Sequence, residues 1–307
     1  MCGIVAFVRK PTELNQIDLS GLVTELEAID KNDIDALKNL DLGTWAEQCI
    51  GLGGTITLVR DAKLRAEISV FANALRAQVE NSLTNDSNLS ELDKEKLVLV
   101  NDALWKMGKD ACSNAEQIQD LIAPHIGDIK TASSNLIAVY RSINLVLRSV
   151  DRIEVRGRDS AGIGIRLNSI SDTSKLDETY PHIHSSPSDS SVLYFNYKRA
   201  AEIGELGDNV RHLRNLIAQD KILFDSVASN EKCHEMVLAH TRWASMGVIS
   251  ENNTQPLDST EMGSPSSSFA LGVLNGDIDN HVALRSECAI ESSITTDAKL
   301  IPVLLVH

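Results

Sequence analysis

The chain has 307 residues, of which 43% are hydrophobic and 23% are charged, enough apolar material for one or two domains with their own cores. The formal charge of −14 at pH 7 disfavours a nucleic-acid backbone or an anionic membrane as a partner. No segment has the apolar length of a membrane span, and no basic region followed by an apolar core opens the chain. The sequence therefore predicts a soluble protein of the cytoplasm.

The five cysteines are an odd number and form no C-x-x-C pair, which argues against a disulfide framework or a zinc ribbon and favours a reducing compartment. Two loose groups, Cys233-His234 with His240 and His182 with His184, are weak candidates for metal ligands. We therefore expect no metal and no cofactor.

The N-terminus is the first candidate for chemistry. A residue as small as Cys2 normally allows Met1 to be removed, which would leave a thiol and a free α-amine on one residue. The thiol is a nucleophile, and an α-amine with an unperturbed pKa of about 7.7–8.0 can accept its proton near neutral pH. The alternative is an ordinary initiator Met followed by an incidental Cys.

Residues 3–8 are apolar and predict a buried strand that would hold Cys2 rigidly. Apolar residues then recur at helical spacing from about residue 10 to residue 149, with a capping box at Ser90 and Asp93, which predicts a small helical bundle. The glycines at 51, 53 and 54 lack the following Lys-Ser/Thr of a phosphate loop and predict a turn or short hairpin.

The pattern changes after Ile153 to that of strands and loops. Strands are expected at residues 161–167, 192–197, 236–241 and 269–274, a surface loop at 168–191, a helix at about 198–218 and a loop at 259–268. Asp297 is expected near the start of a last helix, where a carboxylate interacts favourably with the helix dipole.

Four residues from these later segments could bind an α-amino acid amide around Cys2. A guanidinium pairs with a carboxylate through two parallel bonds, so Arg242 suits an α-carboxylate, and Asp297 suits an α-ammonium. The side-chain amide of Asn275 and the backbone N–H of Gly276 could form an oxyanion hole for attack on the amide carbonyl. Each has an ordinary alternative: a hairpin turn for Asn275-Gly276, a stacking pair for Arg242 with Trp243, and a helix cap for Asp297.

The motifs that carry a family resemblance are Met1-Cys2-Gly3-Ile4-Val5, Arg156-Gly157-Arg158-Asp159-Ser160-Ala161-Gly162, residues 240–247 (His-Thr-Arg-Trp-Ala-Ser-Met-Gly), Asn275-Gly276 and Thr296-Asp297. They resemble the glutaminase domain of the glutamine–fructose-6-phosphate aminotransferases, or glucosamine-6-phosphate synthases. These belong to the class II glutamine amidotransferases, which are N-terminal-nucleophile hydrolases.

The resemblance implies an α+β fold, an αββα sandwich of antiparallel sheets, and hydrolysis of L-glutamine to glutamate and ammonia through a thioester on Cys2. It assigns Asn275 and Gly276 to the oxyanion hole, and Arg242 with the backbone of Trp243 and Ser245 to the α-carboxylate of glutamine. Asp297 is assigned to its ammonium group. In the whole enzyme the ammonia passes to fructose 6-phosphate on sugar-isomerase domains, giving glucosamine 6-phosphate.

The chain departs from the family pattern in three respects. Residues 1–9 and 136–307 match the glutaminase domain, so residues 10–135 are expected to be a helical insertion. Arg158 stands where an aromatic is common, and Ser245-Met246 stand where Thr-His is common. The sequence stops soon after Asp297 and has no sugar-isomerase domain, so we expect a truncated glutaminase domain, with a homo-oligomer as one outcome of its uncovered surface.

Two other functions remain open. One is a non-catalytic binding or regulatory protein on a degenerate glutaminase fold. The other is a glutamine amidotransferase with a different nitrogen acceptor.

Overall fold

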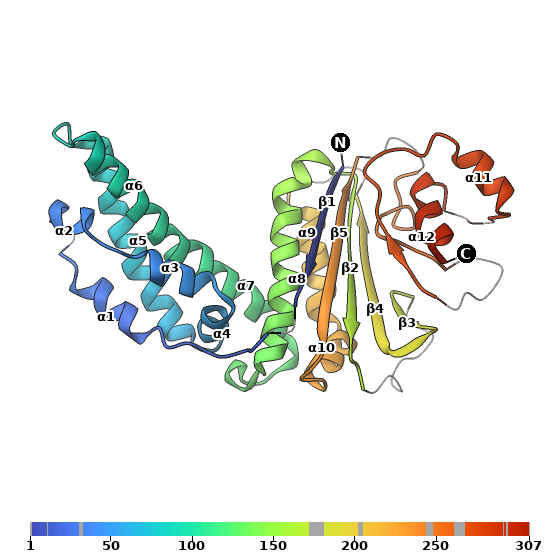
Figure 1. Cartoon of the computed structure of the whole chain (residues 1–307), viewed down its shortest axis with the longest axis horizontal. Helices are drawn as coiled ribbons and strands as arrows, with labels where there is room; N and C mark the ends of the chain where they lie inside the picture. The colour runs from blue at the N-terminus through green and yellow to red at the C-terminus, as the bar shows by residue number, and fades with distance from the viewer. Residues whose placement is uncertain are drawn as a thin grey trace. The chain divides into compact units, whose positions relative to one another are not determined.

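The computed structural model describes residues 2–10, 12–30, 33–171, 181–201, 205–243, 248–260, 268–290, 292 and 294–306. The chain forms two compact units, one made of Met1–Pro11 with Ser142–His307 and the other of Thr12–Arg141 (Figure 1). The protein is thus a mixed α/β chain, with an antiparallel sheet in the first unit and helices in the second.

The second unit is helical, as the spacing of its apolar residues predicted. Its elements are α1 (Ser20–Ala28), α2 (Ile34–Lys38), α3 (Gly43–Ile50), α4 (Leu52–Arg60), α5 (Ala62–Asn85), α6 (Glu91–Trp105), the π-helix η1 (Lys106–Ala111), α7 (Cys112–Ile122), the 3-10 turns η2 (Ala123–His125) and η3 (Ile129–Thr131), and the start of α8 (Ser134–Ile153).

The long helices α5 and α6 bury the apolar stripes that predicted them, and their contact forms part of the core of this unit. The capping box at Ser90 and Asp93 is confirmed: each side chain bonds the backbone N–H of the other residue at the start of α6.

The predicted turn at the three glycines is wrong. Gly51 precedes α4, and Gly53 and Gly54 lie inside it. A Cβ on Gly53 would lie 2.8 Å from the carbonyl oxygen of Asn15, and one on Gly54 would overlap the carbonyl oxygen of Gln48. The glycines are therefore needed for close backbone packing rather than for a turn.

The first unit is built on a five-stranded antiparallel sheet in the order β1-β5-β2-β4-β3. Its strands are β1 (Gly3–Val8), β2 (Ser160–Asn168), β3 (Ile183–Ser186), β4 (Asp189–Ala200) and β5 (His234–Arg242); a second antiparallel pair consists of β6 (Leu257–Asp258) and β7 (Leu271–Gly272).

Helices lie on both sides of this sheet in Figure 1: α8 to α10 on one face and the C-terminal segment on the other. The helical elements after α8 are the 3-10 turn η4 (Glu154–Arg156), α9 (Asp208–Gln219), α10 (Lys221–Ala228), α11 (His281–Glu287), the 3-10 turn η5 (Asp297–Lys299) and α12 (Leu300–Val306).

The C-terminal segment packs closely on the sheet because β2 carries glycines there. A Cβ on Gly162 would overlap the carbonyl oxygen of Gln255, and one on Gly164 would lie 2.9 Å from the Leu271 side chain. Gln255 is followed by a cis bond to Pro256. The two-residue strands β6 and β7 are thereby held over the middle of the larger sheet.

The apolar run at residues 3–8 had predicted a buried strand. This prediction is wrong, because the residues of β1 alternate between half-buried and exposed. Strand β1 is an edge strand paired only with β5, and Ile4 and Val8 are exposed. Its end is anchored by Arg9, whose guanidinium forms an ion pair of 2.9 Å with the fully buried Glu235. Ser142 also donates a hydrogen bond to this carboxylate.

Three other predicted segments differ from the structure. The predicted loop at 168–191 contains β3 and the start of β4, and its residues 172–180 lie outside the described residues. The predicted helix at 198–218 begins only at Asp208, because β4 continues to Ala200. The predicted strand at 269–274 is reduced to two residues.

Among the described residues, no helix is both long enough and apolar enough to cross a membrane.

Candidate active site

Cys2 immediately precedes the edge strand β1, and the pairing of β1 with β5 decides what lies beside it. The register places Gly3 opposite Thr241, so Cys2 lies next to the end of β5. The Sγ atom of Cys2 accepts a hydrogen bond of 3.4 Å from the backbone N–H of Trp243. It also lies 3.7 Å from the carbonyl oxygen of Trp243. A residue 241 positions away thus meets the N-terminal thiol through backbone atoms.

Arg242 is the last residue of β5, and its side chain is buried. Its Nη1 donates a hydrogen bond of 3.4 Å to the carbonyl oxygen of Val248. The backbone of Arg242 packs against Gly157, where a Cβ would lie 2.7 Å from the Arg242 carbonyl carbon. The glycine of the Arg-Gly-Arg-Asp-Ser-Ala-Gly motif therefore allows the chain to approach Arg242 closely.

Burial lowers the pKa of the Arg242 guanidinium, whereas nearby Cys2, Asp159 and Asp297 act in the opposite direction. These three groups are thus close enough to Arg242 to interact with its charge. A buried cation that interacts with a thiol and two carboxyl groups is suited to binding a zwitterionic ligand.

Asp297 starts the turn η5 and is buried. Its Oδ2 accepts a hydrogen bond of 2.7 Å from the backbone N–H of Ile278, and its Oδ1 accepts one of 2.9 Å from Ala298. The expectation that Asp297 lies near the start of the last helix is confirmed, since α12 follows η5 directly. The carboxylate also ties the loop that contains Asn275 and Gly276 to this turn.

The Asn275-Gly276 loop is held at both ends. Before it, the backbone N–H of Leu274 donates to Oε1 of Gln255, and the carbonyl oxygen of Leu274 lies 3.1 Å from Nε2 of His240. After it, Ile278 is bonded to Asp297. Both Asn275 and Gly276 are exposed, and the Asn275 side chain makes no hydrogen bond to any described residue.

His240 is fully buried on β5. Burial and, to a smaller extent, the positive charge of Arg242 lower its pKa to about 4, although the hydrogen bond to Leu274 acts in the opposite direction. His240 is therefore neutral at physiological pH. The two weak metal candidates have other partners: His240 bonds Leu274, and His182 bonds Asp220 at 2.9 Å.

The structure thus brings Cys2, Trp243, Arg242 and Asp297 together and tethers Asn275 and Gly276 to the same turn as Asp297. It does not bond Asn275 to Cys2. Ser245, the remaining candidate, lies in the stretch 244–247, outside the described residues.

Sequence reasoning missed Asn253. This buried residue bonds both the Val248 carbonyl, which Arg242 also contacts, and the residues that precede Asp297. Asn253 stands in a polar stretch, Asn-Asn-Thr-Gln-Pro, that has no periodic pattern. Its position beside Val248 and Thr295 is visible only in the folded structure.

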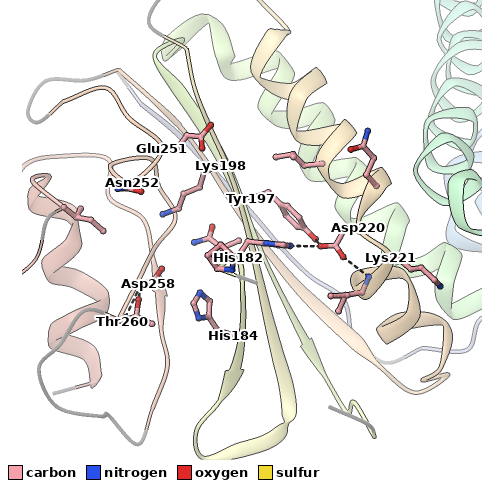
Figure 2. A pocket seen from close by; sticks show the side chains of 16 residues that line it. His182, His184, Tyr197, Lys198, Asp220, Lys221, Glu251, Asn252, Asp258 and Thr260 are labelled. Carbon is pink, nitrogen blue, oxygen red and sulfur yellow. Dashed lines mark hydrogen bonds and ion pairs between the residues drawn. The ribbon is translucent and has the colours of Figure 1, made fainter. Parts of the chain in front are cut away.

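A cavity of about 750 Å³ lies elsewhere in this unit and is lined by none of the six described candidate residues. Figure 2 shows His182 and Asp220 on one side of it and Asp258 with Thr260 on the other. Asp220 accepts hydrogen bonds from Tyr197, Ile222 and Leu223. Its carboxylate is therefore already satisfied by the protein, and the cavity is a mixed polar site without a cluster of one charge.

The chain is similar, over about half of its own length, to a known protein. The glutamine–fructose-6-phosphate aminotransferase (isomerizing) of Idiomarina loihiensis is 27% identical over 175 residues, which are 54% of this chain and 20% of that protein. The chain thus spans about a fifth of the length of this relative. No family model and no solved structure matches the chain. Because the identity is low and the coverage partial, this similarity supports a related family at most.

Proposed function

We propose that this protein hydrolyses L-glutamine to glutamate and ammonia, with Cys2 as the nucleophile once Met1 has been removed. The single observation that carries the proposal is the position of Cys2: its sulfur contacts the backbone of Trp243, beside a buried Arg242 that interacts electrostatically with both Cys2 and Asp297. An α-amino acid amide requires a thiol to attack its amide, a guanidinium to bind its carboxylate and a carboxylate to bind its ammonium group. Three distant segments of the chain supply these groups.

The proposed substrate position follows from the charges. Arg242 holds the α-carboxylate of glutamine with the backbone of Trp243 and Ser245, and Asp297 holds the α-ammonium. Among the described residues, the Asp297 carboxylate accepts hydrogen bonds only from backbone N–H groups and the hydroxyl of Thr296, and it forms no ion pair. The ammonium group of glutamine would form an ion pair with this carboxylate.

In the proposed reaction, the sulfur of Cys2 attacks the side-chain carbonyl carbon of glutamine, and the proton of its thiol passes to the free α-amine of Cys2. The negative charge that develops on the carbonyl oxygen is stabilised by the side-chain amide of Asn275 and the backbone N–H of Gly276. The C–N bond then breaks as the protonated α-amine of Cys2 gives this proton to the amide nitrogen, which departs as ammonia. Water hydrolyses the remaining γ-glutamyl thioester and regenerates the thiol.

The wider assignment rests on the likeness to the aminotransferase and on the motifs. We propose that residues 1–9 with 136–307 form a glutaminase domain of the N-terminal-nucleophile type, into which the helical residues 10–135 are inserted. The relative is named for glutamine and fructose 6-phosphate, so the ammonia made here would serve amino-sugar synthesis when sugar-isomerase domains are present. If the ammonia were passed to a different nitrogen acceptor, the hydrolysis of glutamine proposed here would be the same.

The test is the rate of glutamate release from L-glutamine by protein whose chain begins at Cys2. We expect hydrolysis by this protein, none above background by Cys2→Ala, and none by protein that retains Met1, because its α-amine is then lost to a peptide bond. Cys288→Ala, which removes another half-buried free thiol, is the matched control and should keep the activity. Equal rates for Cys2→Ala and the unchanged protein would remove Cys2 from the mechanism.

One observation favours the non-catalytic alternative. The cavity of about 750 Å³ lies apart from Cys2, so a small molecule could bind there without any reaction at the thiol. Binding of a ligand by both the unchanged protein and Cys2→Ala, in protein that shows no glutamine hydrolysis, would support a binding protein instead.

A further inference from the structure

Asn253 is hydrogen-bonded to residues beside both charged groups of the candidate site, Arg242 and Asp297. It is buried, with 4% of its surface exposed. The side chain of an asparagine can donate two hydrogen bonds and accept two. All four are made here, and they reach two segments that are far apart in sequence.

The side-chain amide nitrogen of Asn253 donates one hydrogen bond on each side of the candidate site, to Val248 and to Thr295. Its Nδ2 donates to the carbonyl oxygen of Val248 at 2.9 Å, and Val248 is the acceptor that Arg242 contacts through Nη1 at 3.4 Å. The position of this shared carbonyl therefore depends on Asn253. The same amide nitrogen also donates to Oγ1 of Thr295 at 3.1 Å.

The acceptor of Asn253 fixes the segment before Asp297. Its Oδ1 accepts hydrogen bonds from the backbone N–H groups of Thr295 and Thr296, at 2.9 and 3.4 Å. Thr296 is the residue from which the turn with Asp297 starts. One side chain thus links the acceptor of Arg242 to the residues that precede Asp297.

We propose that Asn253 is a positioning residue that holds Arg242 and Asp297 at the separation required by the α-carboxylate and α-ammonium of one amino acid. This inference rests on the proposed function, because it deepens the same site. Its consequence is selectivity: Asn253 should matter for amides that carry both α-groups and much less for amides that carry only one.

The neighbouring Asn252 provides a matched control, since it is the same residue type one position earlier and is exposed. Two variants test Asn253 itself. Asn253→Ala removes all four hydrogen bonds. Asn253→Asp keeps the size and the acceptor oxygen for Thr295 and Thr296 but loses the donor to Val248, so it remains informative if the alanine variant fails to fold.

The experiment measures hydrolysis of three amides by the full chain beginning at Cys2: L-glutamine, glutaramate, which lacks the α-ammonium, and 4-aminobutyramide, which lacks the carboxylate. For both Asn253 variants we expect the KM for L-glutamine to rise by about tenfold or more while kcat changes by less than about threefold. The values of kcat/KM for the two truncated amides should change by less than about threefold, and Asn252→Ala should resemble the unchanged protein.

A folded Asn253 variant with unchanged KM for L-glutamine, or with equal losses on all three amides, would overturn the inference, since a merely structural defect would lower every rate together. Failure of the proposed function gives a different result: the unchanged protein would hydrolyse none of the amides, and L-glutamine would not slow the alkylation of Cys2 by iodoacetamide.

Discussion

At the scale of single residues, burial changes the pKa of charged groups in the candidate site. Arg242 is a cation kept in a buried position, and its neighbours Cys2, Asp159 and Asp297 favour its charged form. Such a group is costly to bury without an anionic partner, which is one reason that buried arginines often mark binding sites.

Replacing Arg242 by Lys tests whether its planar guanidinium holds a carboxylate. Lys keeps the positive charge but cannot form two parallel hydrogen bonds with one carboxylate. We expect the KM for L-glutamine to rise by about tenfold in Arg242→Lys, with a smaller change in kcat. Arg199→Lys, which alters a half-buried arginine on β4 outside the candidate site, is the control and should leave KM unchanged. An unchanged KM in Arg242→Lys would exclude Arg242 from carboxylate binding.

His240 predicts a pH dependence of stability. Its pKa falls from an ordinary 6.5 to about 4 in the folded chain because it is buried. Between these values the unfolded chain binds more protons, so the contribution of His240 is complete above pH 6.5 and is lost as the pH falls toward 4. The loss is on the order of 3 kcal/mol.

The measurement is urea unfolding of the unchanged protein and of His240→Asn between pH 7.5 and pH 4.5. The free energy of unfolding should fall less steeply with decreasing pH in the variant. His212→Asn, on α9, is the control and should follow the unchanged protein. The same slope for His240→Asn and the unchanged protein would show that His240 is not held in its neutral form.

At the scale of secondary-structure elements, close backbone packing explains where the glycines stand. Gly54 in α4 and Gly127 lie in the same unit but differ in their surroundings: a Cβ on Gly54 would overlap the backbone of Gln48, whereas one on Gly127 would meet nothing within 4 Å. We expect Gly54→Ala to lower the free energy of unfolding by about 2 kcal/mol through overpacking. Gly127→Ala should change it by less than about 0.5 kcal/mol.

Urea unfolding of both variants measures this difference. Equal stabilities of Gly54→Ala and Gly127→Ala would mean that α4 can move away from Gln48, and that the glycines are not required for its packing.

The elements that the sequence predicted well are those set by local periodicity. The apolar stripes of α5 and α6 and the capping box at Ser90 depend on residues within a few positions of one another, so they are visible without the fold. The glycines of α4 were misread because a Gly cluster that permits close packing has the same local sequence as one that permits a turn.

The candidate site was only partly visible for a related reason. Cys2, Arg242 and Asp297 were found because each residue type suits one group of an amino acid amide. The contact of Cys2 with Trp243 depends on the pairing of β1 with β5, and the role of Asn253 depends on the approach of residues 248 and 295. Neither of these long-range pairings follows from local sequence.

At the scale of the whole molecule, the described candidate residues all lie in the unit made of Met1–Pro11 and Ser142–His307. We propose that residues 10–135, which make up most of the helical unit Thr12–Arg141, are an insertion that leaves this chemistry to the other unit. Its role would then be separate from catalysis. The two cysteines of this unit, Cys49 and Cys112, are both buried. Burial raises their pKa to about 12 and about 11, so neither is a reactive thiolate near neutral pH.

The most direct test of the central claim is mass spectrometry of the protein after reaction with diazo-oxo-norleucine, an electrophile that resembles glutamine. If Cys2 is the nucleophile of a site that recognises the α-amino acid end of glutamine, one adduct should form on Cys2 of chains that begin with this residue. Excess L-glutamine should prevent it, and Asp297→Asn should slow it. Labelling that spreads over Cys233 and Cys288, or labelling of Cys2 that L-glutamine does not reduce, would contradict the proposed glutamine site.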